Sequence, residues 1–370
     1  MITLPNKTIG IIGGGQLGKM MALEAKAMGY KVIILDPASN SPAGQVSDKQ
    51  IVATYSDPKA LEELCAASDV ITYEFENVNS EVIESLEKIH NIPQKSNCLK
   101  VSQHRFLEKN YAKECGIPCI EYRLINCEQD LQQAISELGF PAVLKTARNG
   151  YDGKGQFVLK NHEDIKHCEK LLKEVCVLEQ FITFDKEISV VVTRSEKEIT
   201  YFPIGENIHD NGILRYSIVP ANISLDIKNK AQEIACKLVE SLDYIGTFAV
   251  ELFFKDNDLY FNEMAPRPHN SAHYSIEGCN QSQFHAHVKA VCGLSLFPAY
   301  LKQPTVMLNI LGQDMPQILQ YIQQPHAIES YVHLYGKEEA VQNRKMGHLT
   351  FCGQDVEMLF KEAQSVIKED

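Results

Sequence analysis

A glycine-rich turn near the N-terminus constrains the fold of this chain more than any other feature. Residues 8–12 are apolar and largely β-branched, three glycines follow, residues 16–28 have helical composition, and residues 31–35 form a second apolar run that ends at Asp36. A strand, a tight turn, a helix and a strand in this order begin a parallel α/β sheet. With a further apolar run at residues 70–73, the sequence predicts a doubly wound, Rossmann-like domain that ends near residue 100.

The turn itself has the pattern Gly13-x-Gly15-x-x-Gly18, and Asp36 lies eighteen residues after the last glycine. This is the spacing of a dinucleotide-binding turn, in which N–H groups at a helix N-terminus attract an anion. The pattern alone leaves three possibilities open: an NAD site, another kind of phosphate site, or a tight turn without a ligand.

The rest of the chain alternates short strands with helices. Residues 102–140 look helical at both ends, and short apolar runs near 142–145, 156–159, 175–178 and 187–193 predict strands. The apolar stripe of residues 229–242 predicts the clearest helix. The 370 residues are enough for two or three domains, and the tail beyond about residue 300 mixes short strands and helices.

Composition excludes several classes of function. A formal net charge of −12 argues against a nucleic acid or an anionic membrane as partner, since both require a basic surface. The chain has no apolar stretch of membrane-spanning length and no signal-peptide pattern. Its 11 cysteines include no CxxC pair, so we expect free thiols and a cytoplasmic protein.

Two acids, Glu251 and Glu263, lie on apolar runs that flank a polar turn. If the turn has three residues, 256–258, the two side chains lie opposite each other on one face of a hairpin. Because like charges opposite each other destabilise a sheet, such a pair requires a cation. The metal hypothesis therefore predicts a turn with an odd number of residues.

A second candidate is the loop at residues 149–156, which carries three glycines and Lys154 and follows Lys145 on a predicted strand. It suits a flap that closes over phosphates, although it is not a Walker A loop. An ordinary polar hairpin loop is the alternative.

Weaker candidates are the exposed end of a strand at residues 179–182 with Glu187, and the pair Arg344 and Lys345. In each case a solvated surface is the alternative reading. His269 and His273 are four residues apart, which could indicate a zinc-binding helix, but Pro266 and Pro268 argue against a helix in this segment. Arg267 is better explained as an arginine that binds phosphate or carboxylate.

Taken together, these motifs resemble the ATP-grasp superfamily and, within it, the family of 5-(carboxyamino)imidazole ribonucleotide synthetases of purine biosynthesis. The segments that carry the resemblance, in order along nearly the whole chain, are Gly13-Gly14-Gly15-Gln16-Leu17-Gly18, Thr72-Tyr73-Glu74-Phe75-Glu76-Asn77, Gly150-Tyr151-Asp152-Gly153-Lys154-Gly155-Gln156, Asn207-Ile208-His209, Gly212-Ile213-Leu214-Arg215, Asn262 through Ser271, and Lys345-Met346-Gly347-His348-Leu349.

The resemblance implies a mixed α/β and α+β fold in three parts. These are a Rossmann-like pre-ATP-grasp domain at 1–100, an ATP-grasp region of two α+β subdomains at 101–297 with the flap-bearing subdomain at about 115–180, and a small C-terminal domain at 298–370. It implies an ADP-forming ligase and a homodimer. The ligase would use ATP, Mg²⁺ or Mn²⁺, and bicarbonate to carboxylate the amine of 5-aminoimidazole ribonucleotide through carboxyphosphate.

The resemblance also implies roles for individual residues. For ATP they are Arg105, Lys145, Gly150, Tyr151, Asp152, Gly153, Lys154, Gly155, Gln156, Glu179, Gln180, Phe181, Ile182, Glu187, His209, Asn262 and Glu263. For the ribonucleotide they are Gly15, Gln16, Leu17, Glu74, Asn270, Ser271, Arg344 and Lys345. Glu251 and Glu263 would bind the metal ion, Arg267 and His269 the carboxyphosphate, and Lys154 a phosphate group. Tyr151 and Asp152 would face the aminoimidazole, with Asp152 as the acceptor of its proton.

Three alternatives stay open at this point. One is a sister ligase such as the formate-dependent glycinamide ribonucleotide transformylase. The second is an NAD-dependent dehydrogenase built on the glycine turn, which leaves the Glu251 and Glu263 pair unexplained. The third is a non-catalytic ATP sensor.

Overall fold

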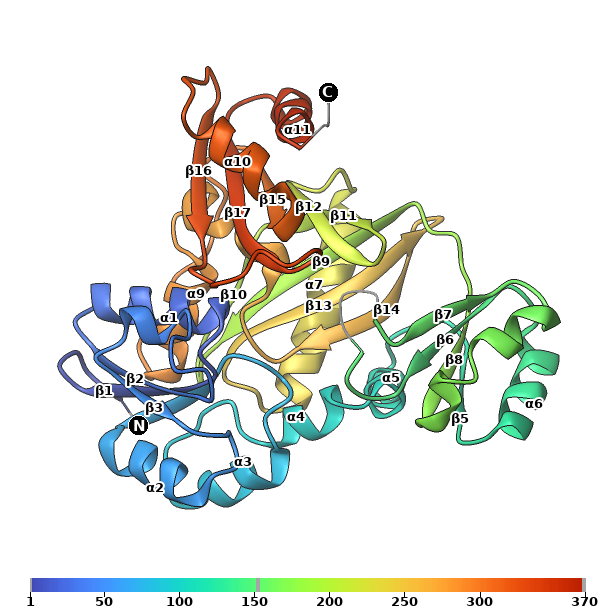
Figure 1. Ribbon diagram of the computed structural model, residues 1–370, viewed down its shortest axis with the longest axis horizontal. Coiled ribbons are helices and arrows are strands. Elements are labelled where there is room, and N and C mark those ends of the chain that lie inside the picture. The colour runs from blue at the N-terminus through green and yellow to red at the C-terminus, as the bar shows by residue number, and fades with distance from the viewer. Residues whose placement is uncertain (1, 151–153, 368–370) are drawn as a thin grey trace.

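The computed structural model describes residues 2–150 and 154–367, and these residues form three β-sheets (Figure 1). The N-terminal sheet is parallel, with the strand order β3-β2-β1-β4. Its elements are β1 (Thr8–Ile12), α1 (Gln16–Ala27), β2 (Lys31–Asp36), the 3-10 turn Gly44–Val46, β3 (Lys49–Val52), α2 (Pro58–Ala67), β4 (Val70–Tyr73), α3 (Ser80–Leu86) and α4 (Asn97–Ser102).

Helices cover both faces of this sheet because its strands are apolar on both sides. Val32 and Ile34 of β2 pack with α1, whereas Ile33 and Leu35 of the same strand pack with α2. The doubly wound arrangement predicted from the sequence is therefore confirmed. β1 is flanked by β2 on one side and β4 on the other, so the chain reverses its direction of winding at the glycine turn, where such folds bind ligands.

A small antiparallel sheet carries the flap. Its strand order is β5-β8-β6-β7, and the flap connects β6 to β7. The elements of this lobe are α5 (Arg105–Glu114), β5 (Tyr122–Ile125), α6 (Glu128–Leu138), β6 (Ala142–Thr146), β7 (Gln156–Leu159), the 3-10 turns His162–His167 and Leu171–Lys173, and β8 (Cys176–Gln180).

The largest sheet is antiparallel and joins the centre of the molecule to its C-terminal part. Its order is β14-β13-β9-β11-β12-β15-β17-β16, with β10 beside β9. The strands are β9 (Lys186–Arg194), β10 (Ile199–Tyr201), β11 (Gly205–Asp210), β12 (Ile213–Val219), β13 (Gly246–Lys255), β14 (Asp258–Ala265), β15 (Thr305–Leu311), β16 (Glu329–Leu334) and β17 (Lys345–Cys352). The helices are α7 (Leu225–Ser241), α8 (Ser275–Gly278), α9 (Gln283–Val291), α10 (Met315–Tyr321) and α11 (Val356–Ser365), with 3-10 turns at Asn270–Ala272 and Gly312–Asp314.

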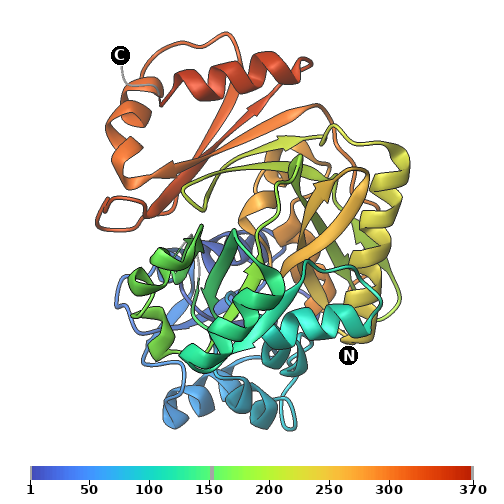
Figure 2. The same ribbon diagram turned by 90° about the vertical axis from the view of Figure 1, so that its right-hand side faces the viewer.

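The pairing of β12 with β15 means that the C-terminal strands continue the central sheet rather than forming a sheet of their own. The C-terminal elements lie above the rest of the molecule in Figure 2, and the flap-bearing lobe lies to the right in Figure 1. The glycine turn, the flap, the end of β14 and the start of β17 all border one cleft. The fold thus brings together four segments that are far apart in the sequence.

Two further observations concern the chain as a whole. Each of the 11 cysteines carries a free thiol. Across residues 2–150 and 154–367, none of the helices combines the length and the apolar character needed to cross a membrane.

Candidate active site

The cleft has a volume of about 950 Å³, and all three parts of the molecule contribute to its walls. Charged and polar side chains dominate these walls, which is typical of a site for a phosphorylated ligand. The residues of the predicted site that line it are Gln16, Leu17, Glu74, Arg105, Gly150, Lys154, Glu251, Glu263, Arg267, His269, Asn270, Arg344 and Lys345.

The β13–β14 hairpin sets Glu251 opposite Glu263, as predicted, but by a different route. Lys255 pairs with Asp258, so the turn has two residues, Asp256 and Asn257, with φ angles of 51° and 66°. The predicted three-residue turn is therefore wrong. A β-bulge next to Glu251 inserts one extra residue on β14, and this shift restores the facing register. A two-residue turn with positive φ at both positions matches the twist of a hairpin.

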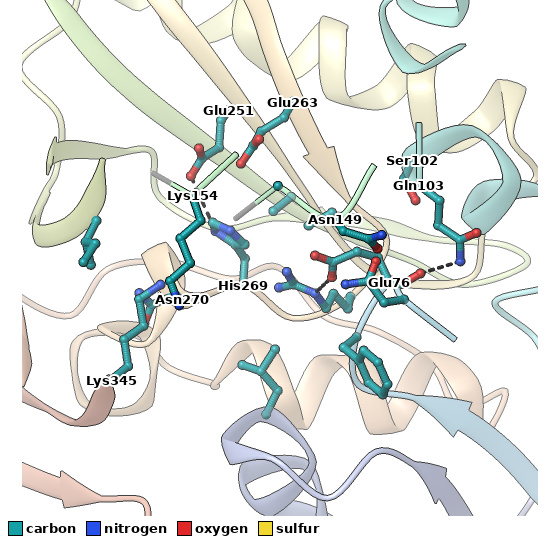
Figure 3. Close-up of a pocket in the computed structure, with 18 of the residues that line it drawn as sticks. Glu76, Ser102, Gln103, Asn149, Lys154, Glu251, Glu263, His269, Asn270 and Lys345 are labelled. Carbon is teal, nitrogen blue, oxygen red and sulfur yellow. Dashed lines mark hydrogen bonds and ion pairs between the residues drawn. The ribbon is translucent and has the colours of Figure 1, made fainter. Parts of the chain in front are cut away.

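Figure 3 shows the carboxylates of Glu251 and Glu263 side by side above His269. Glu251 is only 6% exposed, and burial and the charges of Glu187 and Glu263 raise its pKa to about 8. Glu263 contacts Arg105 at 3.1 Å. Two carboxylates held this close present hard oxygen ligands, so the donor set fits Mg²⁺ or Mn²⁺.

A third acid extends this cluster. The ligand atoms of Glu187, His209 and Glu251 lie within 4.8 Å of one another. His209 Nδ1 is 3.0 Å from a carboxylate oxygen of Glu187. Burial lowers the pKa of His209, but the contact with Glu187 outweighs it and raises this pKa to about 9. Asn262 Nδ2 donates to the other oxygen of Glu187 at 3.2 Å. The predicted nucleotide residues Glu187, His209 and Asn262 thus form one group beside the acid pair.

The side chain of Glu179 is buried between two lysines. Lys145 Nζ donates to it at 2.8 Å, and Lys109 Nζ lies 3.3 Å from its other oxygen. Burial raises the pKa of Glu179, but the charges of Lys109 and Lys145 outweigh it and lower this pKa to about 2. This carboxylate is therefore occupied within the protein, whereas Gln180 at the end of β8 and Phe181 after it are exposed.

The segment after β14 carries Arg267 and His269 into the cleft. Arg267 forms an ion pair with Glu76. Burial raises the pKa of Glu76, but the guanidinium of Arg267 outweighs it and lowers this pKa to about 2. Burial and the charges of Arg267 and Lys345 hold the pKa of His269 well below its ordinary value, so the ring is neutral. Ser271 is fully buried, and its hydroxyl contacts His269 Nδ1 at 2.8 Å instead of lining the cleft.

At the glycine turn the protein's own acids occupy much of the anion site. Glu74 accepts hydrogen bonds from the N–H groups of Gly15 and Gly18, both at 2.5 Å. Asp36 accepts from the backbone N–H groups of Gly14 and Ala38 and from the hydroxyl of Tyr55. Asp36 is buried and both of its oxygens accept hydrogen bonds within the protein, which argues against its binding a dinucleotide ribose and so against the NAD hypothesis.

The remaining donors at the start of α1 face the cleft. The first N–H groups of a helix have no partner within the helix, and Gln16 and Leu17 supply such groups where they border the cleft. Opposite them, Lys345 is partly buried and Arg344 is exposed, with Arg344 Nη1 donating to Glu339 O at 3.1 Å. This arrangement can hold an anionic group between the two parts.

The described residues include both ends of the predicted flap. Tyr151, Asp152 and Gly153 lie outside the described residues. On either side of them, Arg105 Nη2 donates to Gly150 O at 3.4 Å, and Thr146 N donates to Gly155 O at 2.7 Å. Lys154 is exposed at the mouth of the cleft, whereas Gln156 begins β7 beyond it.

Several residues that shape the site have no role predicted from the sequence, namely Glu76, Glu108, Lys109, Arg148 and Lys337. Glu108 accepts from Met264 N at 2.7 Å, and burial and the charge of Glu263 raise its pKa to about 8. Glu108 and Lys109 are adjacent charges on a polar helix, a pattern that normally indicates solvated positions. Glu76 lies within the Thr72–Asn77 segment that carries the family resemblance, and this segment is the only sequence feature that could have indicated a role for Glu76.

A cleft between two α+β lobes, with a facing acid pair on a hairpin and a glycine-rich flap, defines an ATP-grasp enzyme. The sequence matches the ATP-grasp domain family over residues 110–284, the ribonucleotide synthetase preATP-grasp domain family over residues 6–103, and the phosphoribosylaminoimidazole carboxylase C-terminal domain family over residues 305–362. The chain belongs to the N5-carboxyaminoimidazole ribonucleotide synthase family. It is an ADP-forming ligase that carboxylates 5-aminoimidazole ribonucleotide with ATP in purine biosynthesis.

The relatives support this assignment over nearly the full length. The N5-carboxyaminoimidazole ribonucleotide synthase of Bacillus subtilis is 45% identical over 95% of this chain and 93% of its own, and that of Staphylococcus epidermidis is 46% identical over 94% and 93%. A solved ADP complex of an N5-carboxyaminoimidazole ribonucleotide synthetase is 48% identical, with a TM-score of 0.96 and coverage of 99% and 97%. The Aspergillus clavatus enzyme in complex with ADP and 5-aminoimidazole ribonucleotide is 31% identical, with a TM-score of 0.90 and coverage of 98% of both chains.

Proposed function

We propose that the enzyme uses bicarbonate as its one-carbon substrate and proceeds through carboxyphosphate. Bicarbonate is a poor electrophile, so one of its oxygens first attacks the γ-phosphorus of ATP and ADP leaves. The amine of the ribonucleotide then forms a bond to the carboxyl carbon, and phosphate leaves. The observation that carries this proposal is the facing pair Glu251 and Glu263 at one end of a cleft that also holds Arg267 and His269.

Glu251 and Glu263 are the proposed ligands of Mg²⁺ or Mn²⁺, which when bound neutralises the phosphate oxygens of ATP. Phosphoryl transfer depends on positioning and charge neutralisation more than on covalent help. Arg105 and Lys145 therefore hold phosphate oxygens, and the flap residues Gly150 to Gln156, Lys154 above all, cover them. The end of β8, from Glu179 to Ile182, receives the adenine, and Glu187, with His209 and Asn262 beside it, receives the ribose.

Arg267 and His269 are the proposed residues for holding the carboxyphosphate. A neutral imidazole donates a hydrogen bond without adding positive charge, while Arg267 supplies a fixed cation beside it. On the aminoimidazole side we assign Glu74, Tyr151, Asp152 and Asn270, with Asp152 accepting the proton that the amine loses. Closure of the flap excludes water, which protects a reactive intermediate from hydrolysis.

The phosphate of the ribonucleotide is the proposed ligand of two opposing groups. The helix N-terminus at Gly15, Gln16 and Leu17 supplies N–H donors, and Arg344 and Lys345 supply positive charge. The cleft between them supports this assignment, because both groups border it. Ser271 supports the site through its contact with His269.

The division of the chain at about residues 100 and 297 is also a proposal, and the separate sheets on either side of the first boundary support it. We further propose a homodimer, as the family resemblance implies, which light scattering on the purified chain tests. The free thiols of the 11 cysteines support a reducing compartment such as the cytoplasm.

The test of the co-substrate is ADP release from ATP and Mg²⁺ under matched conditions. We expect fast release with bicarbonate and 5-aminoimidazole ribonucleotide together, and slow release when the ribonucleotide is left out. Formate with glycinamide ribonucleotide serves as the control for the sister ligase and should give no release above background. Release that depends on formate, or that is indifferent to bicarbonate in carbonate-free buffer, would contradict the proposal.

A further inference from the structure

The side chain of Gln283, the first residue of α9, holds the backbone of His269 from both sides. Gln283 is fully buried. Its Oε1 accepts a hydrogen bond from His269 N at 2.8 Å, and its Nε2 donates to His269 O at 2.7 Å. We propose that Gln283 is the positioning residue that sets His269 for the carboxyl-transfer step, an inference that rests on the proposed role of His269.

The orientation of this amide follows from its partners. A backbone N–H can meet only the oxygen of the amide, and a backbone carbonyl can meet only its NH₂ group. The second hydrogen of Nε2 points to His273 Nδ1 at 3.2 Å, so this ring nitrogen is an acceptor. The side-chain amide of Gln283 therefore directs its hydrogen bonds at His269 and His273.

The ring of His269 is fixed as well. Its Nδ1 contacts the hydroxyl of Ser271 at 2.8 Å and accepts from Ser271 N at 3.4 Å. Because Nδ1 accepts the hydrogen bond from Ser271 N, the ring carries its proton on Nε2. Nδ1 also lies 3.8 Å from Glu251, which places the ring beside the acid pair. Ser271 thus orients the ring, and Gln283 fixes the backbone from which it projects.

Gln283 is itself tied to the strand that carries Glu251. Thr247 Oγ1, on β13, donates to Gln283 O at 3.0 Å, and Gln283 N donates to Ser275 Oγ at 3.0 Å. These backbone contacts hold the start of α9 against β13, and the side chain of Gln283 connects this position to the backbone of His269. A displacement of about 1 Å in a catalytic group can reduce the rate by about 100-fold.

Four single variants and one double variant of the enzyme test the proposal through its kinetics. Gln283→Met fills the same space without the amide. We expect kcat/KM for bicarbonate to fall by about 10- to 100-fold, with the KM for ATP within about twofold of the original value. Gln281→Met is the matched control, because Gln281 is also buried but bonds to Phe297 O, away from His269. We expect it to leave both constants unchanged.

Gln283→Glu gives a readout that a purely structural role would not. The carboxylate keeps the acceptor for His269 N but places a second oxygen against His269 O. Its protonated form restores a donor there. The activity of this variant relative to the original enzyme should therefore rise as the pH falls from about 8 to about 6. If the activity of Gln283→Glu relative to the original enzyme does not change with pH, the proposal is wrong. This test does not depend on whether Gln283→Met folds.

The variant His269→Asn separates the two proposals. If His269→Asn keeps normal activity, the proposed role of His269 is wrong. If it loses activity while Gln283→Met keeps it, the role of Gln283 is wrong and that of His269 stands. If both lose activity, the double variant should be no worse than His269→Asn alone, since residues that act as a unit do not lose activity additively. Additive losses would show that Gln283 does not act through His269.

Discussion

The facing residues Glu251 and Glu263 do not stabilise the hairpin, which supports their proposed role in binding a metal ion. Like charges directly opposite each other weaken a sheet, and burial together with the charges of Glu187 and Glu263 raises the pKa of Glu251. Arg105 contacts Glu263 of this pair at 3.1 Å. A divalent cation would convert this repulsion into binding free energy.

The first prediction concerns Glu263→Gln. Because the amide cannot neutralise a metal ion, we expect ADP formation to fall by about 100- to 1,000-fold. The melting temperature should be unchanged or slightly higher, because the change relieves repulsion and removes only one partly exposed ion pair. Asp258→Asn, an exposed acid at the start of the same strand, is the control and should keep full turnover. Normal turnover in Glu263→Gln would remove the metal assignment.

The ion pair of Arg267 with Glu76 predicts an acid-sensitive contribution to stability. The pKa of Glu76 falls from its ordinary value of 4.5 to about 2 in the folded protein. The contribution is therefore present above pH 4.5 and is lost as the pH falls from 4.5 toward 2. Its size is about 2 kcal/mol, less than the pKa difference alone implies because the carboxylate is partly exposed.

Thermal unfolding of the original protein and of Glu76→Gln between pH 7 and pH 3 measures this contribution. We expect a constant difference in melting temperature above about pH 5, and a difference that shrinks below about pH 4. A difference that stays the same down to pH 3 would show that the ion pair does not lower the pKa of Glu76. Glu329→Gln, a change at an exposed acid on β16, controls for the loss of one negative charge.

At the scale of elements, the β13–β14 hairpin depends on its turn. Asp256 and Asn257 both have positive φ angles, a conformation that asparagine and aspartate tolerate and β-branched residues do not. We expect Asn257→Val to reduce the free energy of unfolding by about 1–2 kcal/mol. Asn257→Gly should lie within about 0.5 kcal/mol of the original protein in the same denaturant titration.

The turn lies at the far end of the hairpin from the acid pair, so both variants of Asn257 should keep normal turnover. Loss of activity in Asn257→Gly would mean that the turn, and not the bulge, sets the register at Glu251. Equal stability of the two variants would show that the turn does not require positive φ.

The elements show how far the sequence determines the result. Residues 8–36 have local signals for every step, and the parallel βαβ unit follows from them. The hairpin shows what the sequence cannot predict. The facing acids were predicted, but the bulge at Asn262 has no local sequence signal. A bulge arises from the pairing of two strands, because the extra residue is accommodated by the partner strand and not by its own conformational preference. For Glu108 and Lys109, burial comes from the packing of α5 against β14 and the flap lobe, which a polar helix sequence cannot indicate.

At the scale of the whole molecule, the site exists only where three parts meet. β15 and β17 extend the central sheet, so the start of β17 is attached firmly to the strands that carry the acid pair. The N-terminal part is joined to the same region through Lys19 Nζ, which donates to Tyr335 O at 2.9 Å, and Gln45 Nε2, which donates to Gly336 O at 2.8 Å. Ligands at opposite ends of the cleft therefore contact different parts of the chain.

This division predicts a selective effect of Lys345→Ala. Lys345 begins β17 and lines the cleft, as Gln16 and Leu17 of the glycine turn do. Loss of a hydrogen bond to a charged phosphate weakens binding by about 1.5–3 kcal/mol, so the KM for the ribonucleotide should rise about 10- to 100-fold. The KM for ATP should stay within about twofold of the original value, since the proposed ATP ligands lie on other elements.

Lys361→Ala, a change at an exposed lysine on α11 of the same C-terminal part, is the control and should change neither constant. Equal increases in the two constants for Lys345→Ala would mean that the C-terminal part closes over both substrates together, and the assignment of this lysine to the ribonucleotide phosphate would then be wrong.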